Sequence, residues 1–425
     1  MLTLKLIQEN PELVIERLKV KNFDATNLVS SINALNNQRK ETQVKVDEMK
    51  AEMNRLSKEI GQLFQAKKLE EANKAKEQTV QLKDDIKSID ITFDEIDQKL
   101  SELVVQLPNL PHVLVAPGKT EADNVEIRKG GVIPQLPENK QPHWELIQKY
   151  DIIDFELGTK LTGAGFPVYK GKGAKLQRAL ISFFLDEAEK AGYNEIMPPI
   201  LVNEASGFGT GQLPDKEGMM YHATADNLYM IPTAEVPVTN IYRDVILDEE
   251  QLPMKNMAYT PCFRREAGSW GAHVRGLNRL HQFDKVEIVQ IAHPTLSYQI
   301  LDEMVAHVEN LITKLGLPYR IIRLCGGDIS FTSAMTYDFE VYSAAQERWL
   351  EVSSVSNFES FQANRLKCRY KGKEMKKPEL VHTLNGSALA LPRIVAAILE
   401  NNQIADGIKI PEVLVPYCGF DRIGA

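Results

Sequence analysis

The sequence predicts an α+β fold, in which a long antiparallel helical hairpin near the N-terminus is followed by a larger region of strands and helices. Two heptad runs of apolar residues, at positions 28–63 and 82–103, predict the hairpin. From about residue 115 the heptads end, and glycine, proline and aromatic residues become frequent. Dividing 425 residues by roughly 150 per domain suggests about three structural units.

A short helix is expected first, because Asn10 can cap it, Pro11 suits its first position and Glu12 complements its positive end. The hairpin then follows from two 3.5-residue repeats, each of which predicts a helix that buries one seam. The first repeat has nine apolar residues in eleven positions, namely Leu28, Ile32, Leu35, Arg39, Thr42, Val46, Met49, Met53, Leu56, Ile60 and Leu63. The second is wholly apolar, with Leu82, Ile86, Ile89, Phe93, Ile96, Leu100 and Leu103.

The polar segment 64–74 is expected to turn the chain, and Pro108 and Pro111 to stop the second helix. About 40 residues at 1.5 Å each give an arm of roughly 60 Å. Residues 26–68 hold eight basic and five acidic side chains, whereas residues 69–104 hold five and ten. The basic first helix suits contact with a nucleic-acid backbone. A solvated coiled coil whose charges serve solubility is the other explanation, and the charge pattern alone favours it.

Composition excludes several classes of protein. Hydrophobic residues make up 43% of the chain, which is enough to bury a core and excludes a wholly disordered chain. The net charge of −8 excludes a globally basic nucleic-acid coat, although not a local patch. We expect no membrane span, because no apolar run approaches 18–20 residues, and no secretory signal. The cysteines, Cys262, Cys325, Cys368 and Cys418, lie far apart, which fits a reducing cytosol and favours neither disulfides nor a zinc cluster.

The later region begins with a linker or irregular strap over residues 121–141. Residues 172–191 predict a helix that Gly192 ends, and residues 196–202 predict a strand that Pro198 and Pro199 interrupt or confine to an edge. The glycine-rich segment 207–211 lacks the spacing of a phosphate loop, and we expect a mobile loop there.

Residues 257–264 and 280–290 predict two strands joined by a long loop over 266–278. Alternation in the second strand places His281, Phe283, Lys285, Glu287 and Val289 on one face, with Phe283 and Glu287 about 13 Å apart. A carboxylate in such an apolar strand needs a partner, which is either an internal cation or a ligand ammonium.

Arg264 and Glu266 also share a face. Arg264 can grip a carboxylate or phosphate of a ligand, or pair with a nearby carboxylate, and the sequence alone slightly favours the internal pair.

A third polar strand is expected over residues 349–358. There Glu351 and Ser354 have opposite parity, so both can face one ligand only if the strand bends or ends between them. Residues 385–387 are expected to form a strand end or turn. Arg393 falls in the first turn of the following helix, where the helix dipole disfavours a cation, and this suggests that it meets an anion.

These segments, in this order, resemble a bacterial-type seryl-tRNA synthetase, a class II aminoacyl-tRNA synthetase, over essentially the whole chain. Motif one of the class resembles residues 172–202, with Pro199 at the family's dimer-interface position. Motif two resembles residues 262–266 and 279–287, and motif three resembles residues 385–393. The segments 233–235 and 351–354 match the family's amino-acid and ATP contacts.

The resemblance implies an N-terminal tRNA-binding domain over residues 1–110, with its arm at about 26–104, and a class II catalytic domain over residues 111–425. The class II domain is built on a mainly antiparallel sheet flanked by helices. The resemblance also implies two catalytic residues, Arg264 and Arg393. It assigns serine binding to Thr233, Ala234, Glu235, Arg264, Glu287, Asn385 and Ser387. It assigns ATP binding to Arg264, Arg265, Glu266, Arg279, Phe283, Glu351, Val352, Ser353, Ser354 and Arg393.

In these assignments Glu235 and Glu287 meet the serine ammonium and hydroxyl, and Arg264 holds the serine carboxylate and the α-phosphate. Phe283 stacks on adenine. Glu351 and Ser354 bind Mg²⁺ with ATP, and no zinc is expected. The implied enzyme is a serine–tRNA ligase that forms seryl-adenylate from serine and ATP and then charges the 3′ end of tRNA(Ser), and of tRNA(Sec) if the host has one. A cytoplasmic homodimer is implied as well.

Ala388 and Pro392 stand where the wider class has glycines in motif three, which we interpret as variation between lineages because Arg393 is retained. Two other functions are weighed against the ligase. A relative that charges a carrier protein would lack the long arm. A non-enzymatic interaction protein would have lost Arg264, Glu266, Glu287 or Arg393, and all four are present.

Overall fold

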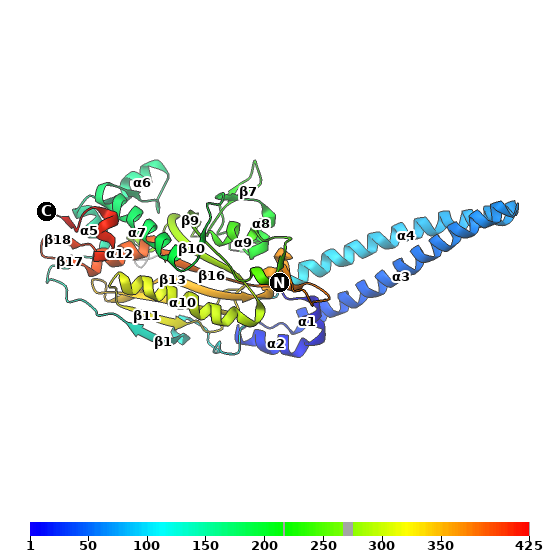
Figure 1. Cartoon of the computed structure of the whole chain (residues 1–425), viewed down its shortest axis with the longest axis horizontal. Coiled ribbons are helices and arrows are strands. Elements are labelled where there is room, and N and C mark those ends of the chain that lie inside the picture. Colours follow the sequence, from blue (N-terminus) through cyan, green and yellow to red (C-terminus); the bar gives the residue numbers. More distant parts are fainter. Residues whose placement is uncertain (216, 267–274, 425) are drawn as a thin grey trace. The chain divides into compact units, whose positions relative to one another are not determined.

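The computed structural model describes residues 1–215, 217–266 and 275–424, so most of the predicted loop over 266–278 lies outside the described residues. The chain divides into two compact units, which are described separately. One unit holds residues 1–19 and 23–108, and the other holds residues 20–22 and 109–425. Figure 1 shows the hairpin of the first unit in blue and cyan.

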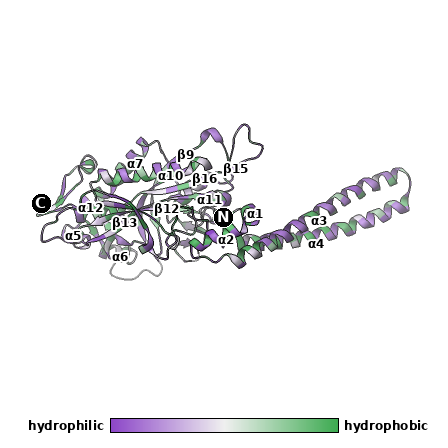
Figure 2. Ribbon diagram, turned by 90° about the horizontal axis from the view of Figure 1, so that it is seen from below, coloured by the Kyte–Doolittle hydropathy of each residue, from purple (hydrophilic) through white to green (hydrophobic). Residues whose placement is uncertain are grey.

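The first unit is helical. Its helices are α1 (Leu4–Glu9), α2 (Pro11–Val20), α3 (Thr26–Gln65) and α4 (Leu69–Val104). The last two form the predicted hairpin, and the least exposed positions along it include Ile32, Val46, Leu56, Ile86 and Leu100, which are seam positions of the two heptad runs. In Figure 2 hydrophilic and hydrophobic residues alternate along both helices. The turn is much shorter than expected, because α3 continues to Gln65 and small residues, Ala72 and Ala75, extend the buried seam into α4.

The second unit is built on an eight-stranded sheet within the described residues, in the order β1-β11-β12-β13-β16-β10-β9-β4. Neighbouring strands are antiparallel except β4, which pairs parallel to β9. The bounds, in that order, are Val125–Gly130, Tyr319–Arg323, Met335–Ser343, Arg348–Glu359, His382–Ala390, Gln282–Ala292, Met254–Phe263 and Asn194–Glu195. The predicted mainly antiparallel sheet is therefore confirmed.

Helices and, in the part of the chain that the structure describes, four small sheets surround this sheet. The helices are α5 (His143–Lys149), α6 (Phe155–Leu161), α7 (Gly171–Lys190), α8 (Glu204–Thr210), α9 (Glu235–Asn240), α10 (Ser297–Lys314), α11 (Ser360–Leu366), α12 (Leu391–Asn401) and α13 (Val415–Cys418). The small sheets are β2-β3 (Ile153–Asp154, Val168–Tyr169), β5-β7-β6 (Leu201–Val202, Leu228–Met230, His222–Ala223), β15-β14-β8 (Glu379–Leu380, Arg369–Lys371, Ile246–Asp248) and β17-β18-β19 (Gln403–Ile404, Gly407–Lys409, Arg422–Gly424).

The two faces of β10 pack against different groups of residues. Even-numbered residues, among them Val286 and Ile288, join the main hydrophobic core with residues of α7, α10 and α12. Odd-numbered residues face the other way, where Val289 packs with Ala234 and Val238 in a small separate cluster. The alternation predicted from the sequence therefore holds, and it leaves Lys285 and Glu287 on the face away from the main core.

Three local expectations were wrong, and a fourth was confirmed in part. The strap over 121–141 contains β1, an edge strand of the main sheet. The strand expected over 196–202 is interrupted at its prolines as predicted, but only Leu201–Val202 remains of it, as an edge strand of a small sheet. The glycine-rich segment 207–211 is not a loop: residues 207–210 belong to α8, which the Asn203 side chain caps through Ser206 N–H at 3.0 Å, and Gly211 ends that helix in the left-handed conformation. Residues 385–387 lie inside β16 rather than at a turn.

None of the described helices has an apolar stretch long enough to cross a membrane.

Candidate active site

The floor of the site is formed by β10 and β16, where Glu287 lies directly opposite Ser387. Glu287 is buried, with 2% of its side chain exposed, and its Oε2 lies 2.7 Å from Lys285 Nζ. Ser387 Oγ donates to the same oxygen at 3.4 Å. Of the two partners left open by the sequence, the internal cation is therefore present, two residues away on the same strand face.

Glu235, the first residue of α9, brings a second buried carboxylate to this floor. Gln362 Nε2 of α11 donates to its Oε1 at 2.6 Å, and Asn385 also forms a hydrogen bond with it. Burial, followed by the neighbouring Glu287 carboxylate, raises the pKa of Glu235 to about 7, against the lowering effects of Gln362, Lys285 and Asn385. Lys285 forms its ion pair with Glu287, and among the described residues no cation pairs with Glu235, so when Glu235 is ionised two carboxylates face one ammonium.

Backbone and neutral side chains complete the pocket. Thr233 is buried, and its Oγ1 accepts from Glu235 N–H at 3.2 Å, while Ala234 is fully buried. Gln362 was not predicted from the sequence. Its Oε1 accepts from Thr383 Oγ1 at 2.7 Å and its Nε2 also donates to the Thr210 carbonyl at 3.0 Å, so these bonds fix the amide that reaches Glu235. A glutamine within a short helix gave no signal in the sequence.

Arg264 lies at the end of β9, with its guanidinium carbon 5.1 Å from the centre of the Phe283 ring. Its Nε donates to the Pro232 carbonyl at 3.4 Å, next to Thr233. Among the described residues no carboxylate pairs with Arg264, so the internal ion pair that the sequence slightly favoured is not found there. The guanidinium therefore extends from the aromatic ring toward the carboxylate pocket.

Two of the remaining predicted arginines, Arg279 and Arg393, are engaged with carboxylates. Arg279 Nη1 lies 2.8 Å from Glu266 Oε2. Arg393 Nη1 lies 3.3 Å from Glu351 Oε2 and donates to the Glu351 carbonyl at 2.7 Å. The anion expected near Arg393 is thus Glu351 in the ligand-free chain. Arg265 is exposed, and its backbone N–H donates to the Met219 carbonyl at 2.8 Å.

A β-bulge removes the parity conflict between Glu351 and Ser354. Along β12, Glu340 pairs with Glu351 but the adjacent Phe339 pairs with Ser353, so β13 carries one extra residue there. That residue, Val352, is buried in the main core. With the extra residue in place, Glu351 and Ser354 can face the same side.

Asp338 lies opposite Ser354 and was missed by the sequence reasoning. Ser354 Oγ donates to its Oδ1 at 2.6 Å. Burial raises the pKa of Asp338 well above its usual range, and the neighbouring Glu351 carboxylate adds to the shift. Hard oxygen donors of this kind suit Mg²⁺.

Two other residues assigned to ATP, Val352 and Ser353, have their side chains engaged within the protein. The Val352 side chain is in the core, and Ser353 Oγ donates to the Ser387 carbonyl at 2.5 Å.

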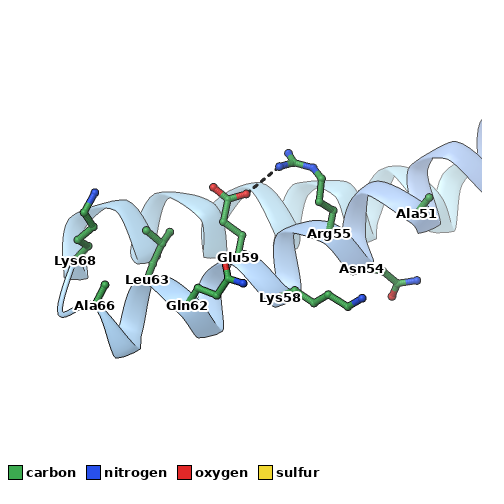
Figure 3. Close-up of a pocket in the computed structure, with 9 residues that line it drawn as sticks. All are labelled: Ala51, Asn54, Arg55, Lys58, Glu59, Gln62, Leu63, Ala66 and Lys68. Carbon is green, nitrogen blue, oxygen red and sulfur yellow. Dashed lines mark hydrogen bonds and ion pairs between the residues drawn. The ribbon is translucent and has the colours of Figure 1, made fainter.

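A separate surface feature lies on the hairpin. A depression near the tip is lined by Ala51, Asn54, Arg55, Lys58, Glu59, Gln62, Leu63, Ala66 and Lys68 (Figure 3). All of these residues belong to α3 or the turn that follows it, so the depression is a surface groove rather than an enclosed cavity. Arg55 is held by Glu52 and Glu59, at 2.7 and 3.0 Å. Lys58 projects into solvent beside it (Figure 3).

Two family models match the chain. The seryl-tRNA synthetase N-terminal domain matches residues 1–111, and the tRNA synthetase class II core domain (G, H, P, S and T) matches residues 220–402. The curated serine–tRNA ligase of Salinibacter ruber is 50% identical over 426 residues, which cover 100% of both chains. The chain belongs to the seryl-tRNA synthetase family.

Solved structures of the family have the same fold. The seryl-tRNA synthetase of Pyrococcus horikoshii, complexed with ATP, superposes with a TM-score of 0.92 at 32% identity, over 100% of this chain and 99% of that one. The cytoplasmic serine–tRNA ligase of Naegleria fowleri, in complex with AMP, gives 0.88 at 26% identity, again over 100% and 99%. The family resemblance and the α+β fold predicted from the sequence are therefore confirmed, and with them an aminoacyl-tRNA ligase.

Proposed function

We propose that this chain is a serine–tRNA ligase that activates serine with ATP and transfers the seryl group to the 3′ end of tRNA(Ser), and of tRNA(Sec) where the host has one. The observation that carries the proposal is the charge of the carboxylate pocket. Glu287 pairs with Lys285, and within the described ranges no cation pairs with Glu235, so a ligand ammonium would supply the missing positive charge. A small amino acid brings that ammonium.

The hydroxyl of serine fits the same pocket. Asn385 and Ser387 are buried at its floor, where an apolar ligand would leave their polar groups unpaired. Alanine is therefore rejected for lack of a hydroxyl, and threonine is rejected by its extra methyl group. The serine carboxylate would lie toward Arg264, whose guanidinium extends from Pro232 to Phe283.

ATP would lie along β10 with adenine on Phe283 and its α-phosphate near Arg264. As serine attacks the α-phosphorus, Arg264 would stabilise the charge that spreads over the phosphate oxygens. Arg393 and Arg279 would exchange their internal partners, Glu351 and Glu266, for the phosphates. No side chain of the pocket forms a covalent intermediate, and positioning with charge stabilisation carries the reaction.

Mg²⁺ is proposed at Glu351 and Ser354, with Asp338 beside them. The half-buried Asp338 carboxyl and its bond to Ser354 support this assignment, since a nearby cation would favour the ionised acid. When bound, the ion would neutralise charge on the ATP phosphates.

The two units are proposed to divide the work, with residues 1–110 binding tRNA through the arm at about 26–104 and residues 111–425 carrying out the chemistry. The basic side chains of α3, including Lys58 beside the groove, suit an RNA backbone. We also propose a cytoplasmic homodimer. Met197, next to the motif-one prolines, is 88% exposed, which is unusual for a large apolar side chain unless another surface covers it.

Serine-dependent exchange between ATP and pyrophosphate tests the function directly, with threonine, alanine and glycine as controls. Exchange with serine alone supports the pocket assignment. Exchange only with another amino acid would keep the family and overturn the serine pocket. Charging of tRNA(Ser), measured beside a phosphopantetheinylated carrier protein, then decides the acceptor.

A further inference from the structure

A buried His–Glu pair lies outside the substrate pocket. His143 is the first residue of α5 and Glu400 lies in the last turn of α12, and the side chains of both are fully buried. His143 Nδ1 lies 2.7 Å from Glu400 Oε1, and the His143 backbone N–H donates to the same oxygen at 2.8 Å. Gln346 Nε2 and Ser343 Oγ also donate to the Glu400 carboxylate. The carboxylate is therefore held firmly by four donors.

The hydrogen bonds also determine the form of the imidazole. Leu277 N–H points at His143 Nε2, at 2.9 Å. An amide N–H can only donate, so Nε2 must accept and the ring proton must be on Nδ1, where it is donated to Glu400. Glu400 thus fixes the tautomer that allows His143 to receive the Leu277 amide.

Leu277 belongs to a functionally placed turn. The 3₁₀ turn η4 (Gly276–Asn278) stands directly before Arg279 in motif two. The carbonyl of Asn278 in the same turn accepts from Arg393 Nε at 3.2 Å. The turn therefore fixes the backbone position from which the Arg279 side chain extends. It also holds one edge of the Arg393 guanidinium, whose other edge reaches Glu351.

Gly276 shows how closely the imidazole supports this turn. Gly276 has φ +67°, and a Cβ there would lie 2.3 Å from His143 Nε2. Only glycine can occupy that position without pushing the imidazole away. The absence of a side chain at Gly276 lets the His143 ring contact the backbone of the turn directly.

We propose that His143 is a positioning residue for ATP: oriented by Glu400, it fixes the Gly276–Asn278 turn so that Arg279 and Arg393 are aimed at the phosphates. The proposal rests on the function given above. It predicts a loss specific to ATP, because the carboxylate pocket for serine shares none of these bonds. A merely structural histidine would instead lower stability and affect both substrates alike.

Two substitutions in the full chain separate the two nitrogen contacts. In His143→Asn the amide nitrogen replaces Nδ1 and still donates to Glu400, but nothing reaches Leu277. In His143→Gln the amide oxygen replaces Nε2 and can still accept from Leu277. Affinity for a non-hydrolysable Mg–ATP analogue, measured by titration without amino acid, is expected to fall about tenfold in His143→Asn and less than about threefold in His143→Gln. The KM for serine in pyrophosphate exchange is expected to stay unchanged in both.

Gly276→Ala tests the same contact from the other side and covers the case in which a His143 variant fails to fold. Gly316→Ala is its matched control, since Gly316 has φ +71° but nothing within 4 Å of an added Cβ. Weaker ATP-analogue binding in Gly276→Ala than in Gly316→Ala supports the proposal. Equal ATP affinity in the two alanine variants, or equal losses for ATP and serine in His143→Asn, would overturn it. A wild-type chain that binds the ATP analogue but shows no serine exchange would refute the proposed function alone.

Discussion

Glu235 and Glu287 face the single ammonium of Lys285, and this arrangement explains why three ionisable groups are tolerated in the middle of a sheet. Lys285 pairs with Glu287 on its own strand, Glu287 also accepts from Ser387 of β16, and Glu235 accepts from Gln362 of α11, so none is buried unpaired. Arg264 differs, because among the described residues it meets a carbonyl and an aromatic ring rather than a carboxylate. That difference marks it as the cation that is available to a ligand.

Replacing Arg264 by alanine should therefore reduce serine-dependent pyrophosphate exchange about 100- to 1000-fold, the usual cost of one lost donor to a developing charge. The fold should persist, since the guanidinium makes a single long hydrogen bond to a backbone carbonyl. Steady-state exchange and circular dichroism measure the two effects. Arg264→Lys is the control, and it should recover part of the rate. Wild-type exchange in Arg264→Ala would remove the residue from the mechanism.

Serine binding should depend on pH near neutrality. Burial raises the pKa of Glu235 to about 7. A proton on the pocket then competes with the serine ammonium, so affinity should weaken about tenfold per pH unit below 7 and level off above it. Titration of serine into the protein across that range measures the profile. Identical affinities at about pH 6 and pH 8 would contradict it.

Glu235 should also affect how the free energy of unfolding depends on pH in the absence of ligand, and its raised pKa determines the direction of that effect. Because its pKa in the folded chain lies above the ordinary value, the folded state holds the proton more tightly than the unfolded chain. Glu235 thus contributes stability at low pH that is lost as pH rises from about 4.5 to about 7. Glu235→Gln should lack that part of the slope in urea unfolding.

For single residues, the sequence predicted which positions carry charged side chains, but not which side chains bond to them. Lys285 and Glu287 were placed on one face by alternation, and their ion pair follows from it. Gln362 and Asp338 were missed because each comes from a strand or helix whose neighbours are fixed only by long-range pairing. Sequence spacing carries no information about such contacts.

Among the elements, the hairpin was the most predictable, because its 3.5-residue period is a local signal repeated many times. Its turn was predicted too long, since alanines at 72 and 75 were not counted as seam residues. The α8 helix was missed for a related reason. A Cβ added at Gly207 or Gly209 would lie within 3 Å of a neighbouring leucine side chain, so the absence of a Cβ at these positions serves close packing rather than flexibility.

Shortening the arm should separate the two steps of the reaction. Arg39 pairs with Asp97 across the hairpin at 3.4 Å, so residues 43–92 can be replaced by a short turn above that pair. Pyrophosphate exchange should stay near the wild-type rate, while tRNA(Ser) charging should fall by at least about tenfold because the RNA loses its basic contacts. Lys58→Ala within an intact arm tests the groove alone. Undiminished charging by the shortened chain would end the arm's proposed role.

At the scale of the whole molecule, the proposed homodimer gives an exposed side chain a reason. Met197→Asp should shift the mass in solution toward the monomer, because a charge would be buried at the interface. Light scattering after size-exclusion chromatography measures the mass. Val80→Asp is the control, since Val80 is also exposed, at 62%, but lies on the arm. A wild-type chain that is already monomeric at micromolar concentration would refute the assembly.

Because of the bulge in β13, the proposed Mg²⁺ side of the pocket depends on the number of residues between Glu351 and Ser354 as well as on their chemistry. Glu351 and Ser354 share a side only because one residue too many lies between the paired positions of the neighbouring strand. Deleting Val352 would remove the bulge and at once shorten the spacing of Glu351 and Ser354 to two residues, so a regular strand would still hold both oxygen donors on one side. The bulge and the three-residue spacing therefore compensate for each other, and the site should tolerate the loss of both together but not the loss of the bulge alone.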